Sequence, residues 1–242
     1  MTTAICNTNN TNNYYNHNNL NKEPLYNIKI LFNGDFKVGK TSIVKRFMNE
    51  DFQVHHNVST IGIDFKIIKK MVNDKLVKIQ LWDQSRGCEN RRLISTFYRG
   101  ANVIIFTYDI TNKESFENIS KIWVKEYNQY ITTTLHSNNL FQPILVLIGT
   151  KLDLRNQNIE KCVSMEQGKE LAKQINAELF FEVSSLDNTG IDDSLNEILF
   201  CIINNPNLKT EQELSLIKQQ KLHQIDDQNI ENYQHSKHCI IN

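Results

Sequence analysis

The sequence carries no net charge that would point to a class of partner. Lys and Arg together number 27, and Asp and Glu also number 27, so the formal charge is zero. Such a balance gives no support for a nucleic-acid binder or for a protein that acts on acidic substrates. No apolar run approaches the ~20 residues that span a bilayer, and the amino terminus lacks the basic-then-apolar pattern of a signal peptide. We therefore expect any membrane attachment to come from something other than a transmembrane helix.

Cysteine is also scarce, and it lacks the spacing of a metal site. The five cysteines are odd in number and never form C-x-x-C: Cys6, Cys88, Cys162, Cys201 and Cys239. A disulfide framework or a zinc site would show paired spacings. The pattern is typical of a reduced, intracellular protein.

Composition divides the chain of 242 residues into three parts. Residues 1–23 are rich in Asn and Thr and nearly devoid of apolar side chains, so we predict a disordered tail. Residues 24–205 alternate apolar runs with helical patterns and are long enough for one domain. Residues 206–242 turn polar again and form a predicted flexible tail, although three apolar side chains there allow a transient helix: Leu214, Ile217 and Leu222.

The middle part alternates predicted strands with predicted helices, which indicates an α/β domain with a mostly parallel sheet and helices on both faces. The expected strands cover residues 25–32, 64–72, 75–82, 103–108, 144–149 and 179–183; the expected helices cover residues 40–48, 113–131, 164–175 and 192–203. Asn73 and Asp74 form a two-residue turn pair, which favours an antiparallel hairpin. Ser164 and Gln167 have the spacing of a capping box at a helix start.

A phosphate-binding pattern, G-x-x-x-x-G-K-[ST], lies between the first expected strand and helix. Its residues are Gly34, Asp35, Phe36, Lys37, Val38, Gly39, Lys40 and Thr41. Backbone N–H groups of such a loop curl around phosphates at the positive end of the helix. Lys40 would reach the outer phosphates, and the Thr41 hydroxyl would bind Mg²⁺. A chance glycine-containing turn is the alternative, and the strand and helix on either side disfavour it. The motif indicates a nucleoside triphosphate without specifying the base.

A second motif, Thr150-Lys151-Leu152-Asp153, follows the expected strand 144–149. The Asp153 carboxylate can accept hydrogen bonds from guanine N1–H and from its exocyclic amine, an arrangement that adenine does not offer. The stem of Lys151 can cover the base plane. Three residues after the next strand would add a backbone N–H for the guanine carbonyl oxygen: Ser184, Ser185 and Leu186. In isolation these residues would be an ordinary polar strand end, but their order after the phosphate motif favours guanine.

With these motifs in order, residues 25–203 resemble a Ras-superfamily GTPase, closest to the Rab branch. The resemblance rests on four further stretches: Ile61-Gly62-Ile63-Asp64-Phe65, Lys78-Ile79-Gln80-Leu81-Trp82-Asp83, Phe97-Tyr98-Arg99-Gly100-Ala101 and Tyr108-Asp109-Ile110-Thr111. The run from Thr150 to Arg155 instead has Rho-family wording, with Thr where Rab proteins have Asn. The resemblance implies the P-loop small-GTPase fold, a mixed six-stranded sheet flanked by helices, and residues 24–205 as its GTPase domain.

The resemblance also implies ligands, roles and partners. It implies GTP or GDP with Mg²⁺, the metal held by Thr41, Thr60 and Asp83, and Phe52 against the base edge. An effector surface would comprise Ile61, Phe65, Trp82 and Phe97, although the three aromatic residues could equally be core side chains. The implied partners are an exchange factor, effectors, a prenyltransferase and a dissociation inhibitor, with no nucleic acid, and the protein is expected to be a monomer in membrane traffic.

The chain departs from the family where GTP would be hydrolysed. Family members carry Asp-x-x-Gly-Gln, whereas this chain has Arg86 in place of the glycine and Gly87 in place of the water-orienting glutamine. Phe36 replaces a small loop residue, and Lys37 adds a charge beside it. We favour a protein that binds GTP but hydrolyses it slowly or not at all. Two alternatives stay open: Arg86 or Lys37 compensates by stabilising the transition state, or the protein is a scaffold without nucleotide binding.

The last four residues, Cys239-Ile240-Ile241-Asn242, fit the prenylation pattern C-a-a-X. Prenylated Cys239 would hold the protein at the cytoplasmic face of a membrane, and a single lipid would leave a cytosolic pool. A chance cysteine near a flexible end is the alternative.

Overall fold

The computed structural model describes residues 23–50, 63–84, 97–134, 142–157 and 162–217, together with residue 219. The predicted disordered tail, apart from residue 23, lies outside these ranges. So do six of the sequence-predicted site residues: Phe52, Thr60, Ile61, Arg86, Gly87 and Cys239.

The observed elements alternate as the sequence predicts, and their ends differ from the expected ones by at most three residues. The strands are β1 (Tyr26–Asn33), β2 (Ile63–Val72), β3 (Lys75–Gln84), β4 (Val103–Asp109), β5 (Ile144–Thr150) and β6 (Leu179–Glu182). The helices are α1 (Lys40–Phe47), α3 (Lys113–Asn118), α4 (Val124–Thr134), α5 (Met165–Gln174) and α6 (Ile191–Ile203), with a π-helical turn at Ile119–Trp123 and a 3-10 helix at Leu152–Gln157.

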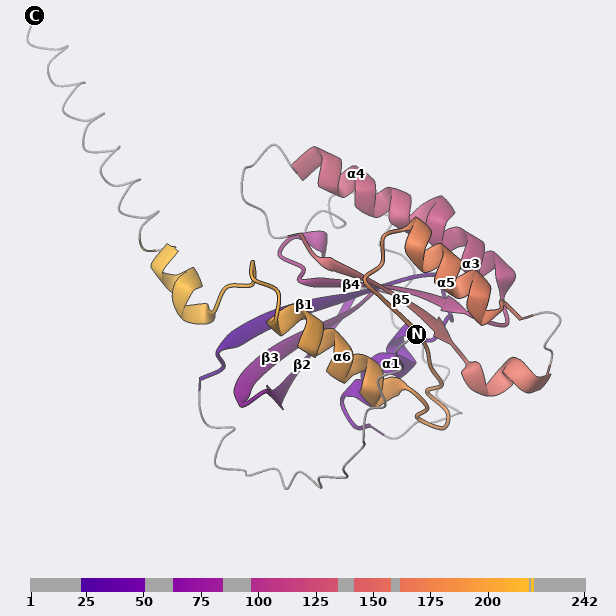
Figure 1. The fold of residues 1–242 in the computed structure, drawn as a ribbon, viewed down its shortest axis with the longest axis horizontal. Helices are drawn as coiled ribbons and strands as arrows, with labels where there is room; N and C mark the ends of the chain where they lie inside the picture. The colour runs from indigo at the N-terminus through magenta and orange to yellow at the C-terminus, as the bar shows by residue number, and fades with distance from the viewer. Residues whose placement is uncertain are drawn as a thin grey trace, which may run out of the picture.

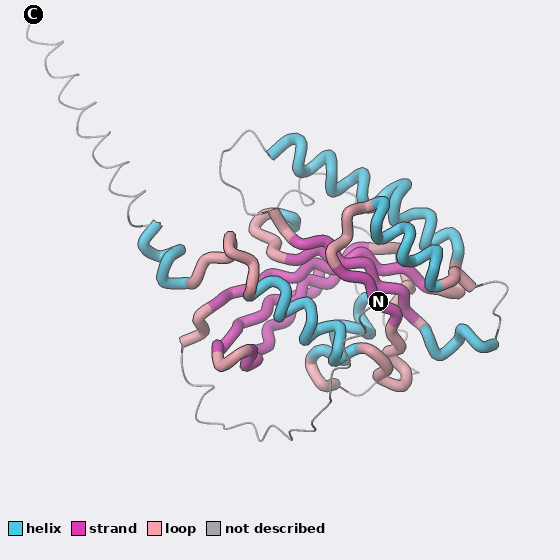
Figure 2. Tube along the Cα trace, in the orientation of Figure 1, coloured by secondary structure: helices cyan, strands magenta, loops and turns pink. Residues whose placement is uncertain are grey.

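The strands form one six-stranded sheet in the order β2-β3-β1-β4-β5-β6. Only β2 runs antiparallel to its neighbour, and the other pairings are parallel. Figure 2 shows this sheet between two layers of helices, and Figure 1 identifies α1 and α6 on one face and α3, α4 and α5 on the other. The predicted mixed six-stranded sheet flanked by helices is therefore confirmed.

Strand side chains alternate between the two faces and build two apolar cores. On β4, Ile105 packs in the core beneath α1 and α6, whereas Ile104 and Phe106 pack beneath the other three helices. This alternation is the period of two that a strand imposes. Every residue of β4 is buried, as expected for a central strand covered by helices on both sides. The buried centre of the sheet therefore extends to the ends of the strands, where the polar loops begin.

Local signals in the sequence account for one turn and one helix start. Asn73 and Asp74 both adopt positive φ, 49° and 59°, in the two-residue turn that joins β2 to β3, as a type I′ hairpin requires. Ser164 accepts a hydrogen bond from the Gln167 backbone, and the Gln167 side chain accepts one from the Ser164 backbone. The hairpin and the capping box are confirmed.

The expected helix over 113–131 is wrong in one respect, because the π-helical turn Ile119–Trp123 interrupts it. The Val124 N–H donates to the Ile119 carbonyl, five residues back. The apolar pattern of the sequence does not distinguish such a turn from a continuous α-helix. Residues at this turn, Asn118 and Trp123, contact Asp35 of the loop after β1.

The described chain beyond the predicted boundary at residue 205 keeps contact with the domain. Leu208 packs against the core, and the Glu211 N–H donates to the Leu25 carbonyl over 3.0 Å. Residues 211–217 are helical. None of the helices in the described ranges is both long and apolar enough to cross a membrane.

Candidate nucleotide-binding site

The described residues of the predicted phosphate, metal and guanine sites gather at the carboxyl ends of the parallel strands. The register pairs Phe32 of β1 with Asp83 of β3, and Asp109 of β4 with Thr150 of β5. The segments that follow these strands therefore lie side by side at one edge of the sheet. In open α/β sheets this edge is where ligands bind.

The phosphate loop leaves β1 in a path that only glycine allows. A Cβ atom at Gly34, where φ is 144°, would lie 2.1 Å from the Thr107 carbonyl oxygen of β4. Gly39 precedes α1 with a φ of 103°, in the region that side chains avoid. The loop thus passes against the sheet and leads directly into the amino-terminal end of α1, where free N–H groups favour phosphate.

Lys40 begins α1, and its ammonium group lies inside the loop. Its Nζ atom donates to the carbonyl oxygens of Gly34 and Asp35, each over 2.7 Å. Burial lowers the pKa of Lys40 to about 8, while the carboxylates of Asp83 and Asp35 act to raise it. A polyanion entering the loop would supply the negative charge that this buried ammonium lacks.

Thr41 and Asp83 bring two oxygen ligands together. The Thr41 hydroxyl donates to Oδ2 of Asp83, which is buried at the end of β3. Hydroxyl and carboxylate oxygens are the donors that Mg²⁺ prefers. The residues present therefore fit a magnesium ion beside the phosphate loop.

The side chain of Asp35 points away from this pair. Its Oδ1 accepts from Trp123 Nε1 over 2.8 Å, and its Oδ2 accepts from Asn118 Nδ2 over 2.7 Å. The next two loop residues, Phe36 and Lys37, are exposed, and the Lys37 ammonium lies 5.4 Å from the centre of the Phe36 ring. Lys37 adopts a φ of 64°, which is uncommon outside glycine.

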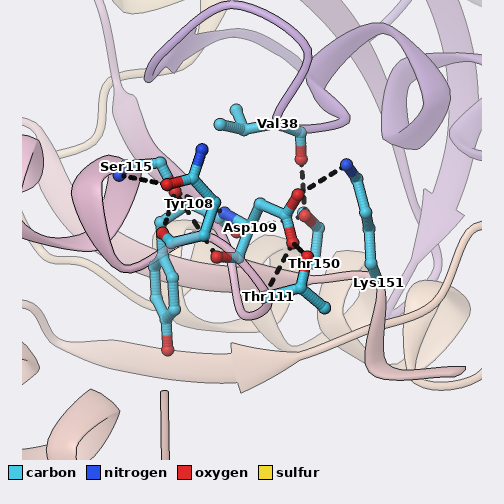
Figure 3. Close-up of polar contacts among 8 residues, drawn as sticks. Val38, Tyr108, Asp109, Thr111, Ser115, Thr150 and Lys151 are labelled. Carbon is cyan, nitrogen blue, oxygen red and sulfur yellow. Dashed lines mark hydrogen bonds and ion pairs between the residues drawn. The ribbon is translucent and has the colours of Figure 1, made fainter. Parts of the chain in front are cut away.

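Thr150 joins the phosphate loop to the predicted base motif. Its hydroxyl lies 2.5 Å from the Val38 carbonyl oxygen and 3.1 Å from that of Tyr108, so its one proton is shared between two carbonyl acceptors, of which Val38 is the nearer (Figure 3). Val38 belongs to the phosphate loop, whereas Thr150 ends β5. The Thr that distinguishes this motif from the Rab wording therefore has a structural partner in the loop.

Lys151 is held by a carboxylate from the neighbouring strand. Its Nζ lies 2.5 Å from Oδ2 of Asp109, while Oδ1 of Asp109 accepts from the backbone and the hydroxyl of Thr111 (Figure 3). Lys151 itself has a φ of 62°. Its ammonium group is thus fixed, which leaves the aliphatic stem to cover an apolar plane.

Asp153 is oriented by the loop after β6. The Ser184 hydroxyl donates to Oδ1 of Asp153 over 2.6 Å, and the Leu186 N–H donates to the Ser184 hydroxyl oxygen over 3.2 Å. Arg46 of α1 donates to the carbonyl oxygens of Ser185 and Leu186, over 2.8 and 3.0 Å. The structure thus brings together all of the predicted guanine-binding residues except Phe52, which lies outside the described ranges.

Comparison with known proteins agrees with this geometry. The sequence model of the Ras family matches residues 29–204, which is most of the chain. The chain belongs to the Ras family. It is 35% identical over 175 residues to the GTP-binding protein YPT1 of Saccharomyces cerevisiae, covering 72% of this chain and 78% of that relative.

Other Ras-family relatives carry Rab names. The chain is 37% identical over 174 residues to the Ras-related protein RabC of Dictyostelium discoideum, covering 71% of this chain and 81% of the relative. It is 34% identical over 204 residues to the Ras-related protein RABC2a of Arabidopsis thaliana, covering 83% and 91%. The Rab-like resemblance stated from the motifs is thereby confirmed, and the fold is the P-loop small-GTPase fold.

The three aromatic residues of the predicted effector surface form a continuous row in this Ras-family domain. Ring centres lie 4.9 Å apart for Phe65 and Trp82, and 6.4 Å apart for Trp82 and Phe97. Exposure falls along the row, from 41% for Phe65 to 2% for Phe97, with Trp82 partly buried. Phe97 is therefore a core residue, and only the Phe65 end of the row is open to a partner.

Sequence reasoning missed several residues that hold the site together. Asp109 was part of a family motif without a role, although its place at the end of β4, opposite Thr150, could have identified it. Arg46 had no signal, because its carbonyl partners lie far along the chain. Asn118 and Trp123 had none either, since a continuous helix was expected there.

Proposed function

We propose that this Rab-like protein is a GTP- and GDP-binding switch in vesicle and membrane traffic whose own hydrolysis of GTP is weak or absent. The observation that carries nucleotide binding is the convergence, at one sheet edge, of the phosphate loop, the Thr41–Asp83 pair and the Asp153–Ser184 pair. These three elements match the phosphates, the metal and the base of one guanine nucleotide.

Each group in the site has one task in this proposal. Lys40 would exchange its two loop carbonyls for the outer phosphates. Thr41 and Asp83, with Thr60, would hold Mg²⁺, which neutralises phosphate charge when bound. Asp153 would accept from guanine, the stem of Lys151 would cover the base, and Phe52 would lie at its edge. The segment Ser184-Ser185-Leu186 would supply a backbone N–H for the guanine carbonyl oxygen.

Weak hydrolysis rests on the sequence of the segment after β3. Gly87 offers no side chain to orient an attacking water, and positions of this kind change rates by about 10³ or more. Arg86 adds bulk where the family has glycine. Within the residues that the structure describes, the exposed Phe36 and Lys37 add bulk and charge to the phosphate loop. The alternative functions are compensation by Arg86 or Lys37, and a scaffold that keeps the fold without nucleotide.

Partners and location follow from the same family membership. We propose that an exchange factor and effectors read the nucleotide state through Ile61 and the Phe65 end of the aromatic row. Prenylation of Cys239 would place the protein at the cytoplasmic face of a membrane, and a dissociation inhibitor would maintain a cytosolic pool.

Single-turnover hydrolysis tests the proposal. The full chain is loaded with GTP and Mg²⁺, and bound nucleotide is followed by chromatography beside an Arg86→Gly/Gly87→Gln variant. The proposal expects intact GTP on the natural protein and hydrolysis by the variant. Turnover by the natural protein at the rate of ordinary relatives would contradict weak hydrolysis. A natural protein that retains neither GTP nor GDP would instead support the scaffold.

A further inference from the structure

Asp35 is the one acidic residue of the phosphate loop 34–41. A carboxylate in a loop that receives phosphates would repel them if it turned inward, because like charges at close range are unfavourable. In the structure both carboxylate oxygens are occupied by neutral donors, Trp123 Nε1 and Asn118 Nδ2. These hydrogen bonds hold the carboxylate against the helical segment.

The backbone of Asp35 is held at the same time from the opposite side. Its carbonyl oxygen accepts from Lys40 Nζ over 2.7 Å. The second loop residue is therefore fixed through its side chain by the helix and through its backbone by the lysine that would contact phosphate. Removing the side-chain contacts would leave only a bond that Lys40 gives up when it turns to a ligand.

The π-helical turn explains how one helix supplies both donors. Asn118 and Trp123 are five residues apart, and in an α-helix such residues point about 140° away from each other. In a turn closed by a bond from residue i+5, residues five apart lie about one full turn apart and share a side of the helix. The Val124 N–H to Ile119 carbonyl bond is such a closure. The irregular turn thus places both donors against a single carboxylate.

We propose that Asn118 and Trp123 are positioning residues that clamp the phosphate loop through Asp35 and thereby set how long a bound nucleotide remains. This inference rests on the proposed function, since it assumes that the loop binds a guanine nucleotide. The clamp acts on the loop from outside the site, and neither side chain needs to touch the ligand.

Release of fluorescent GDP from the full chain, chased with excess unlabelled GDP in Mg²⁺, tests the clamp. Trp123→Phe keeps an aromatic side chain but removes the five-membered ring that carries the N–H donor, and Asn118→Ala removes the other donor. Loss of one hydrogen bond to a charged group is expected to speed release about fivefold or more, and loss of both by about tenfold or more. Ile122→Ala, in the same turn and 47% exposed, is the matched control and should release GDP at the natural rate.

A double-variant comparison separates the clamp from simple packing. In an Asp35→Ala background, Trp123→Phe should produce no further acceleration, because its partner is already gone. The melting temperature of each variant is measured as well, because a purely structural role would change stability without changing the rate of GDP release.

Two outcomes overturn the clamp, and they differ in what they say of the proposed function. If the natural protein retains GDP and both clamp variants release it at the natural rate, even with lower melting temperatures, the residues serve packing only. If the natural protein retains no nucleotide, the proposed function and the clamp fail together. Full acceleration by Trp123→Phe in the Asp35→Ala background would also contradict the clamp, because the effect would then bypass Asp35.

Discussion

The two halves of the candidate site differ in how their polar groups are engaged. On the base side, formed by Thr150, Lys151, Asp153 and Ser184, side chains are oriented by contacts that base binding would not need to break. On the phosphate side, formed by residues 34–41 and Asp83, Lys40 and Thr41 bond to protein oxygens that their ligands would replace. In the proposed nucleotide complex, base recognition would therefore be preorganised, whereas phosphate and metal binding would require an exchange of partners.

The difference has an energetic meaning. Preorganised groups lose little freedom on binding, so their contacts contribute to selectivity directly. Groups that must exchange partners contribute only the difference between the old and the new bonds. The family departures that concern hydrolysis belong to the phosphate half of the proposed site: Phe36, Lys37, Arg86 and Gly87. On the base side, the departure is Thr150. Selectivity for the base and control of the phosphate are thus separable in this chain.

The largest expected effect breaks the phosphate side by closing the space at Gly34. In Gly34→Ala the new methyl group would meet the Thr107 carbonyl at 2.1 Å, so we expect a loss of at least about 3 kcal/mol in the free energy of unfolding. Urea denaturation measures it. Gly100→Ala is the control, because its Cβ would meet nothing within 4 Å and its positive φ costs only about 1 kcal/mol. Equal losses in the two variants would contradict the steric argument.

A nearly equal effect is expected on the base side, from Asp153→Ala. The variant loses two hydrogen bonds to a charged acceptor, so affinity for GDP should fall about 100-fold. The sharper readout is selectivity: the natural protein should prefer GDP over inosine diphosphate, which lacks the exocyclic amine, and the variant should lose that preference. Asp187→Ala, on an exposed residue of the next loop, is the control. A retained preference would place base recognition elsewhere.

A smaller effect on GDP affinity is expected from a change of pH, and it should arise from Lys40 on the phosphate side. Burial lowers the pKa of Lys40 to about 8 in the free protein, and bound phosphate would raise it. Below pH 8 the ammonium is already charged and affinity should be flat. Above pH 8 binding must take up a proton, so affinity for GDP should fall by up to about tenfold per pH unit. Calorimetry in two buffers of different ionisation enthalpy measures the number of protons taken up when GDP binds. Binding without proton uptake at pH 9 would contradict the assignment of this effect to Lys40.

The smallest expected effect concerns the bond that connects the two sides. Thr150→Val keeps the shape and removes the hydroxyl that bonds to the Val38 carbonyl, so GDP release should become about fivefold faster. Thr107→Val is a matched control. Its buried hydroxyl on β4 has no hydrogen-bond partner among the residues that the structure describes, so its removal should leave release unchanged. Similar rates in the natural protein and Thr150→Val would mean that the sides are not connected through this residue.

Local patterns were sufficient for the parts of the fold that local physics determines. The phosphate loop could be placed because its glycines, Lys40 and the flanking strand and helix are contiguous. The turn at Asn73 and Asp74 and the capping box at Ser164 are likewise properties of a few neighbouring residues. The prediction of a mixed six-stranded sheet, by contrast, came from the family resemblance, and the order of its strands comes from the structure.

Contacts between distant segments could not be read from the sequence. The ion pair of Lys151 with Asp109 depends on the register of β4 against β5. Two hydrogen bonds, from Asn33 Nδ2 to the Tyr98 hydroxyl and from that hydroxyl to Glu126 Oε1, join the end of β1, the helical residues before β4, and α4. The π-helical turn is of the same kind, since its apolar residues also fit an ordinary helix. These features arise when elements pack, and no single segment encodes them.

The hydrogen bond between the Glu211 N–H and the Leu25 carbonyl places residue 211 beside the residue that precedes β1. Leu25 precedes β1, and the phosphate loop follows it, so the length of an eight-residue strand, roughly 25 Å, separates the two ends. The chain therefore enters the domain, and passes residue 211 on leaving it, at the pole opposite the nucleotide site. A bead, a surface or a fusion partner attached through either tail would therefore be linked to the domain at the end opposite the candidate site.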